Sequence, residues 1–175
     1  MAAPQIARPT EDEYAPYYGR YVSRVPEGDV LELLATQIGD TRALIRSIPE
    51  SRGDHRYAPG KWSIKEVIGH VTDSERIFCY RALRIGRGDA TPLPGYEQDD
   101  YIAPGGFDRR TLADLSEELA AVRQATLLLF RHFDAAALAC RGTASGNPVS
   151  TRAIAYIIAG HERHHVEILK TRYAA

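Results

Sequence analysis

The sequence is poor in cysteine and in long apolar runs. Its two cysteines, Cys79 and Cys140, cannot build a disulfide framework and lack the spacing of a metal-binding cysteine motif. Apolar runs such as residues 127–130 are far shorter than the roughly 20 residues that span a bilayer. The first residues contain no apolar stretch suited to a signal peptide. These absences predict a cytoplasmic protein that does not bind membranes.

The chain also lacks a net charge of either sign. Its 22 basic and 23 acidic residues leave a formal charge of -1, so composition gives no reason to expect nucleic-acid binding or attraction to an anionic surface. An apolar content of 44% argues against disorder, and 175 residues are enough for one domain with a continuous core. We therefore expect a single soluble domain.

Apolar residues recur at helical spacing in four segments of the chain. The segments begin at Asp29, Ser63, Thr111 and Ser150 and end near Pro49, Gly86, Phe133 and Arg172. No stretch alternates with a period of two, so no sheet is expected and residues 142–148 are interpreted as a loop. The pattern predicts an all-α fold, a four-helix bundle with a long crossover between its second and third helices.

Two segments lie outside these helices. Residues 1–28 are rich in proline and tyrosine, and we expect them to form an arm packed on a single bundle domain of residues 29–175. The arm's anchors would be its tyrosines, Tyr14, Tyr17, Tyr18 and Tyr21. Residues 87–110 form the crossover, and connections of this length are usually functional. Its Asp99, Asp100 and Tyr101 are candidates to cover the mouth of a site.

The last helix places two histidines on its apolar stripe. At about 100° per residue, His161 and His165 fall within roughly 40° of one line that also holds three isoleucines. Two buried imidazoles cost desolvation energy unless each finds a partner, which a shared divalent cation or a hydrogen-bonded pair would supply. Other polar residues of this helix are expected to face mostly toward solvent: Arg152, Glu162, Arg163 and Lys170.

A third histidine, His70, lies on the inner face of the second helix. A bundle can bring this face opposite the last helix, and three imidazoles would leave coordination positions open for water or substrate. Residues 161–165 also match the H-E-x-x-H motif of zinc proteases, with Glu162 as general base. That match is a minor alternative, because those proteases take their third ligand from further downstream. Here the third histidine lies upstream, so the trio favours a different metal site.

The remaining candidates flank this site. His164 is expected to make a hydrogen bond to a ligand, and Cys79 to pack rather than coordinate. Asp73 and Arg81 either orient a ligand or hold an anionic substrate, or they are ordinary surface charges. The other two histidines, at positions 55 and 132, are expected to be solvated.

Three sequence blocks resemble the DinB/YfiT-like superfamily of metal-binding four-helix bundles, which is distinct from the DNA polymerase named DinB. The first block, residues 57–70, contains W-S-x-x-E-x-x-x-H ending at His70. The second is Leu-Pro-Gly-Tyr at residues 93–96, and the third is the closing H-x-x-H-H at residues 161–165. The resemblance extends from about Tyr14 to Tyr173.

The resemblance implies a divalent metal ion, zinc or nickel, held by His70, His161 and His165. Members of the superfamily resemble thiol-dependent S-transferases, a mycothiol-dependent isomerase and proteins described as metal-dependent hydrolases. Related bundles look dimeric, so a homodimer is expected. The partners implied are a small-molecule substrate and a low-molecular-weight thiol, with no nucleic acid and no membrane.

Three hypotheses follow for the function. In the first, the metal activates a thiol or water against a small-molecule electrophile, as in an S-transferase or hydrolase. In the second, the chain is a non-catalytic, stress-related metal-binding protein. Structural zinc sites usually have four protein ligands, and only three are evident here. In the third, a metal-free bundle binds an apolar ligand between its helices.

Overall fold

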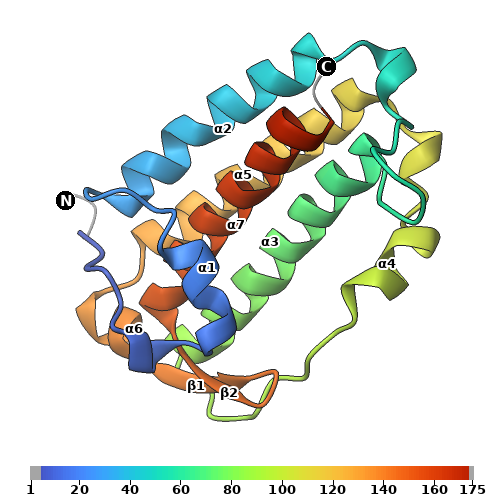
Figure 1. The fold of residues 1–175 in the computed structure, drawn as a ribbon. Helices are drawn as coiled ribbons and strands as arrows, with labels where there is room; N and C mark the ends of the chain where they lie inside the picture. The colour runs from blue at the N-terminus through green and yellow to red at the C-terminus, as the bar shows by residue number, and fades with distance from the viewer. Residues whose placement is uncertain (1–4, 174–175) are drawn as a thin grey trace.

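The computed structural model describes residues 5–173 and shows four long helices packed side by side (Figure 1). They are α2 (Val30–Ser47), α3 (Ile64–Gly86), α5 (Leu112–Arg131) and α7 (Thr151–Arg172). Helices α2 and α7 run in one direction, and α3 and α5 run in the other (Figure 1). Both α2 and α3 pack against α5 and α7. The predicted four-helix bundle is confirmed. Within the described chain, no helix combines the length and apolar character needed to cross a membrane.

The four helices begin where the sequence places their capping residues. Asp29 Oδ1 accepts a hydrogen bond from the backbone of Leu31 at 2.7 Å. Ser63 and Glu66 form a capping box in which each side chain accepts from the other residue's backbone N–H, at 3.2 and 2.6 Å. The N-terminal caps of α5 and α7 are Thr111 and Ser150. Local hydrogen bonding therefore fixes the register at which each helix enters the bundle.

The expectation of no sheet was wrong for residues 141–150. Strands β1 (Arg141–Ala144) and β2 (Asn147–Ser150) form an antiparallel hairpin. Both residues of its turn, Ser145 and Gly146, have positive φ, at 52° and 74°, as in the tight turns that match strand twist. Each strand has only four residues, so alternation was too short to detect.

The crossover between α3 and α5 contains the short helix α4 (Gln98–Gly105) and runs outside α3 (Figure 1). Its start is tied to the hairpin, because Leu93 donates to the carbonyl of Thr143 at 2.8 Å. Another short helix, α6 (Ala135–Ala139), precedes the hairpin. Single 3-10 turns complete the described secondary structure, at Glu11–Glu13, Pro16–Tyr18, Glu50–Arg52 and Phe107–Arg109. The crossover thus forms an outer wall beside α3.

Residues 5–28 lie along the bundle, and their helix α1 (Gly19–Val22) packs on α7. Of the four proposed anchors, Tyr14 and Tyr21 are buried, Tyr18 is half-buried and Tyr17 is exposed. The contact is close because position 160 is glycine: a Cβ there would lie 2.0 Å from the carbonyl oxygen of Tyr21. Residues 1–4 of the predicted arm lie outside the described residues.

A cluster of buried charged and polar side chains crosses the bundle, and we call it the Arg123 network. Arg123 donates to Glu75 through Nε and Nη2, both at 2.8 Å, and to Glu162 through Nη2 at 2.7 Å. Thr41 donates to Glu162 at 2.6 Å, and Thr126 donates to Glu75 at the same distance. The complete network consists of Gln37, Thr41, Glu75, Arg123, Thr126 and Glu162. It joins all four long helices.

The expectation that Glu162 faces solvent was wrong, since this residue is only 1% exposed. The reason is the position of α7, which is covered by α1, α2 and α3 on different faces. A helix surrounded in this way has no single apolar stripe, so angular position alone does not predict exposure. Arg163 and Lys170 of the same helix are exposed as expected.

Candidate metal centre

The three predicted histidines meet at the contact between α3 and α7. His70 lies on α3, while His161 and His165 lie one turn apart on α7. One ring nitrogen from each residue lies within 4.8 Å of the other two. The Nε2 atoms of His70 and His161 are 3.1 Å apart. Tetrahedral zinc with bonds of about 2.0 Å separates its ligand nitrogens by about 3.3 Å, so this spacing is close to that of a metal centre.

Burial keeps these imidazoles neutral. His70 and His161 are 4% and 5% exposed, and His165 is half-buried. Burial lowers the pKa of His70 to about 4. Burial and the neighbouring imidazoles hold the pKa values of His161 and His165 well below the usual range. At neutral pH all three therefore carry the free nitrogen lone pair that a metal ion requires.

The hydrogen bonding of the cluster is incomplete in a way that suits a cation. The Nδ1 atom of His165 is buried without a hydrogen-bond partner among residues 5–173. An unsatisfied buried nitrogen costs free energy, and each neutral imidazole has one ring nitrogen whose lone pair can accept a hydrogen bond or bind a metal ion. A divalent ion between the rings would satisfy several lone pairs at once. The donor set present therefore fits a zinc-like or nickel-like ion.

A second layer of contacts orients His70. Ser74 lies one turn along α3, and its Oγ is 3.4 Å from Nδ1 of His70. The same Oγ is 2.9 Å from the hydroxyl of Tyr96 in the crossover. The indole of Trp62 also packs against His70, with 4.7 Å between the ring centroids. These contacts fix the ring plane and leave Nε2 facing the other histidines, an arrangement typical of metal ligands.

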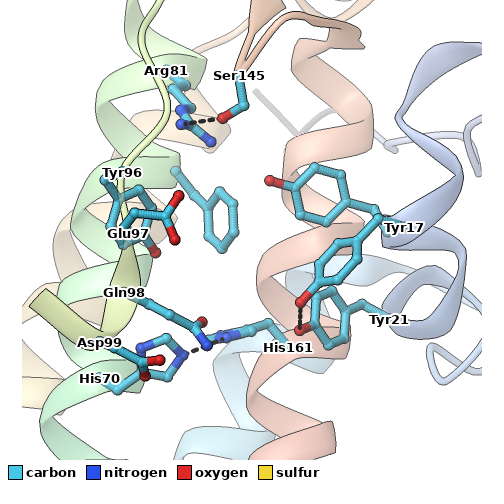
Figure 2. Close-up of a pocket in the computed structure, with 12 residues that line it drawn as sticks. Tyr17, Tyr21, His70, Arg81, Tyr96, Glu97, Gln98, Asp99, Ser145 and His161 are labelled. Atoms are coloured by element: carbon cyan, nitrogen blue, oxygen red, sulfur yellow. Dashed lines mark hydrogen bonds between the residues drawn. The ribbon is translucent and has the colours of Figure 1, made fainter.

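A cavity of about 390 Å³ reaches this cluster, and we call it the main cavity. His70 and His161 lie at one end, and Arg81 and Ser145 lie at the other (Figure 2). Its walls come from the arm, α3, the crossover, the hairpin turn and α7, so segments far apart in the sequence share one space. Its aromatic lining residues are Tyr17, Tyr18, Tyr21, Phe78 and Tyr96.

A second cavity of about 270 Å³, the side cavity, reaches His165. Trp62, Tyr57 and Tyr173 line it. Gln98 and Asp99 line both cavities, which places the start of α4 between them. The histidine cluster can therefore be approached from two directions. The position of Asp99 agrees with the prediction that the crossover covers the mouth of the site. The sequence analysis did not single out Gln98, which also lines both cavities.

Other crossover and flanking candidates take different places. Tyr101 packs edge-on against Tyr96 at 5.2 Å, while Asp100 is exposed. Asp73 pairs with Arg76 at 3.3 Å and does not line the main cavity. Arg81 does line this cavity, so of the two charged candidates only Arg81 faces the site.

The remaining predicted residues lie at the margin or away from the cluster. The ring of His164 contacts Tyr21 and His165, and the expected hydrogen bond to a ligand is not seen among the described residues. The thiol of Cys79 lies 3.1 Å from Thr126 Oγ1, which agrees with a packing role. His55 and His132 are exposed. The contact between Ser74 and His70 follows a pattern that is visible in the sequence, because residues four apart on a helix lie beside each other.

Comparison with models of known protein families assigns the chain to a family. Residues 33–169 match the model of the DinB superfamily. The chain belongs to the DinB superfamily. The matched region includes all three histidines and most of the bundle. A comparison of this DinB protein with curated protein sequences finds no match.

Two solved structures have similar folds. YfiT from Bacillus subtilis, described as a probable metal-dependent hydrolase with an unusual four-helix bundle topology, has a TM-score of 0.68 and 14% identity. The similarity covers 95% of this chain and 93% of YfiT. The mycothiol-dependent maleylpyruvate isomerase has a TM-score of 0.66 and 17% identity, with 83% of this chain and 61% of the isomerase covered. At these identities the likeness shows the fold.

Proposed function

We propose that this DinB protein is a metal-dependent enzyme. His70, His161 and His165 hold a divalent ion, zinc or nickel, which lowers the pKa of a bound thiol or water and so supplies a nucleophile at neutral pH. The observation that carries the proposal is the convergence of three neutral imidazoles at one end of an open cavity. A purely structural zinc site usually has four protein ligands and is closed.

The protein's own residues prepare the site for this chemistry. The Ser74–Tyr96 pair holds Nδ1 of His70, which keeps Nε2 directed toward the cluster. The aromatic walls of the main cavity offer flat surfaces against which a small organic molecule can pack beside the histidines. Cys79 is unsuited to act as nucleophile, because burial raises the pKa of its thiol to about 11.

The favoured reaction is transfer of a low-molecular-weight thiol onto an electrophilic small molecule. Two cavities meet at the histidines, which suits two reactants approaching from different sides. The sulfur forms a bond to the electrophilic carbon, the leaving group departs with the bonding electron pair, and the thiol proton passes to solvent. The dependence of the similar isomerase on mycothiol supports this choice, and the description of YfiT as a hydrolase supports water as the alternative nucleophile. The proposal places the enzyme in the cytoplasm as a homodimer.

Metal analysis tests the proposal first. Untagged protein purified without chelator is compared with His161→Ala and with His132→Ala, a control for an exposed histidine. We expect about one metal ion per chain in the wild type and the control, and none in His161→Ala. Absence of metal from the wild type after incubation with zinc and nickel would contradict the proposal and favour a bundle with hydrogen-bonded core histidines.

Ligand exchange separates an enzyme from the alternative, a non-catalytic metal-binding protein. Cobalt-loaded protein is titrated with azide and with N-acetylcysteine while the visible spectrum is recorded. A catalytic site exchanges its water and the spectrum shifts, whereas a closed structural site leaves the spectrum unchanged. Turnover of chlorodinitrobenzene with N-acetylcysteine, lost in His161→Ala, would then assign thiol transfer.

A further inference from the structure

Arg81 is a buried cation without an acidic partner. It is 4% exposed, yet it forms no ion pair with any carboxylate of residues 5–173. The other deeply buried arginine, Arg123, binds two carboxylates. Burying a guanidinium without a counter-charge is costly, and a protein rarely retains such a group unless an anion meets it.

The neighbours of Arg81 hold it in place without neutralising it. Its Nη2 donates to the carbonyl of Pro94 and to Oγ of Ser145, both at 3.0 Å. The ring of Tyr96 lies 6.0 Å from the guanidinium carbon. All these partners are uncharged, and they fix the guanidinium on the wall of the main cavity (Figure 2). The remaining nitrogens, Nε and Nη1, make no hydrogen bond within residues 5–173, so they are available to a ligand.

The distance along α3 sets the shape of that ligand. Arg81 follows His70 by eleven residues, which is about three turns and roughly 16 Å of rise on nearly the same helix face. Between them the main cavity is lined by Phe78 and by tyrosines of the arm and the crossover, together with Glu97 and Gln98 (Figure 2). A ligand that touches both ends is therefore elongated and carries no negative charge in its middle, where Glu97 would repel it.

We propose that Arg81 binds the carboxylate of an elongated monocarboxylic acid whose other end reaches the histidine cluster. A guanidinium matches the two oxygens of a carboxylate through paired hydrogen bonds. The exposed carboxylates of Glu97, between Arg81 and the cluster, and of Asp99, beside His70, line the same cavity (Figure 2), so they disfavour ligands with a second acidic group away from Arg81. Only the identity of the reacting end rests on the proposed function; the carboxylate contact does not.

Calorimetric titration of the full chain tests this assignment with a matched pair of probes, ω-phenyloctanoate and ω-phenyloctanol. The acid should bind the wild type at least about tenfold more tightly than the alcohol, since hydrogen bonds to charged groups carry this much affinity. In Arg81→Gln the preference for the acid should fall to less than about twofold, while the affinity for the alcohol stays unchanged and confirms that the cavity is intact.

Two further variants make the result specific. Arg81→Lys keeps the positive charge and should retain part of the preference, whereas Arg76→Gln removes an exposed arginine of the same helix and should retain all of it. Equal affinity of the wild type for both probes, no binding of the acid, or a preference that survives Arg81→Gln would each overturn the assignment. Metal content measured on the same samples keeps a failure of the metal centre distinguishable from a failure of the carboxylate site.

Discussion

The Arg123 network and the histidine cluster lie beside each other along α7. His161 belongs to the cluster, and the next residue, Glu162, belongs to the network. In the network the buried charges are paired: Arg123 makes four hydrogen bonds to two carboxylates and the carbonyl of Leu34, although the side-chain oxygen of Gln37 has no partner within residues 5–173. In the cluster, a buried ring nitrogen of His165 has no partner within residues 5–173. The network pairs buried charges and joins the four long helices, whereas the cluster presents neutral ring nitrogens at the end of a cavity, where a ligand can reach them.

The largest effect is expected from breaking the network. Arg123→Met leaves Glu75 and Glu162 facing each other without a counter-charge and should cost about 3–5 kcal/mol of unfolding free energy, measured by urea denaturation. Arg110→Met, in a partly exposed ion pair with Asp114, is the control and should cost less than about 1 kcal/mol. Metal content of the protein that remains folded should not change, and its loss would show that the two regions are one functional unit.

A metal ion should complete the cluster and stabilise the fold. At a free zinc concentration of about 100 times the dissociation constant, we expect a gain of about 2.7 kcal/mol, because the ion binds the folded chain. The gain is measured as the difference in unfolding free energy with and without metal. His161→Ala should show no gain, and an equal gain in this variant would place the metal elsewhere.

The contact between Ser74 and His70 should tune metal affinity. Ser74→Ala removes the oxygen beside Nδ1 and should weaken metal binding about tenfold, with little change in the fold. The matched control is Ser116→Ala, since Oγ of Ser116 is buried without a partner among the described residues. Competition with a chelating dye measures both. Equal affinity in the two variants would show that Ser74 does not orient the ligand.

The smallest effect concerns Cys79, which lies next to the network: its thiol contacts the hydroxyl of Thr126, a member of the network. Burial raises the pKa of this thiol to about 11, although the hydrogen bond with Thr126 lowers it. The reactive thiolate should therefore be scarce at pH 8 and increase as the pH approaches 11. In a Cys140→Ala background, alkylation by iodoacetamide should be slow at pH 8 and should accelerate after denaturation. Fast alkylation of the folded protein would show that the thiol of Cys79 is accessible to solvent and is not buried beside the network.

The sequence was a good guide where local patterns decide the structure. Capping residues such as Asp29 and Ser63 predicted helix starts, because these hydrogen bonds form within one turn. The spacing of His161 and His165 placed both on one face, and His70 could be assigned to the facing helix. The position of these three histidines together required only that α3 and α7 be neighbours.

Long-range contacts were beyond the reach of such patterns. The pattern of α7 predicts a surface position for Glu162, because its partner Arg123 lies 39 positions earlier in the chain, on another helix. The hairpin at residues 141–150 was missed because its strands are too short to show alternation. Likewise, Tyr96 reaches Ser74 only through the course of the crossover. These features depend on which segments the fold brings side by side.

The missing side chain at Gly160 has a consequence for how such a protein can diversify. Any Cβ at this position would collide with the backbone of Tyr21 and push the arm away from α7. The proposed metal ligands themselves belong to α3 and α7, whereas the arm supplies the tyrosine side of the main cavity and the ring of Tyr21 that packs on His161. A side chain as small as a methyl group at position 160 would therefore change the wall of the main cavity that the arm provides. Related proteins that share the three histidines can in this way differ in the ligands that they bind.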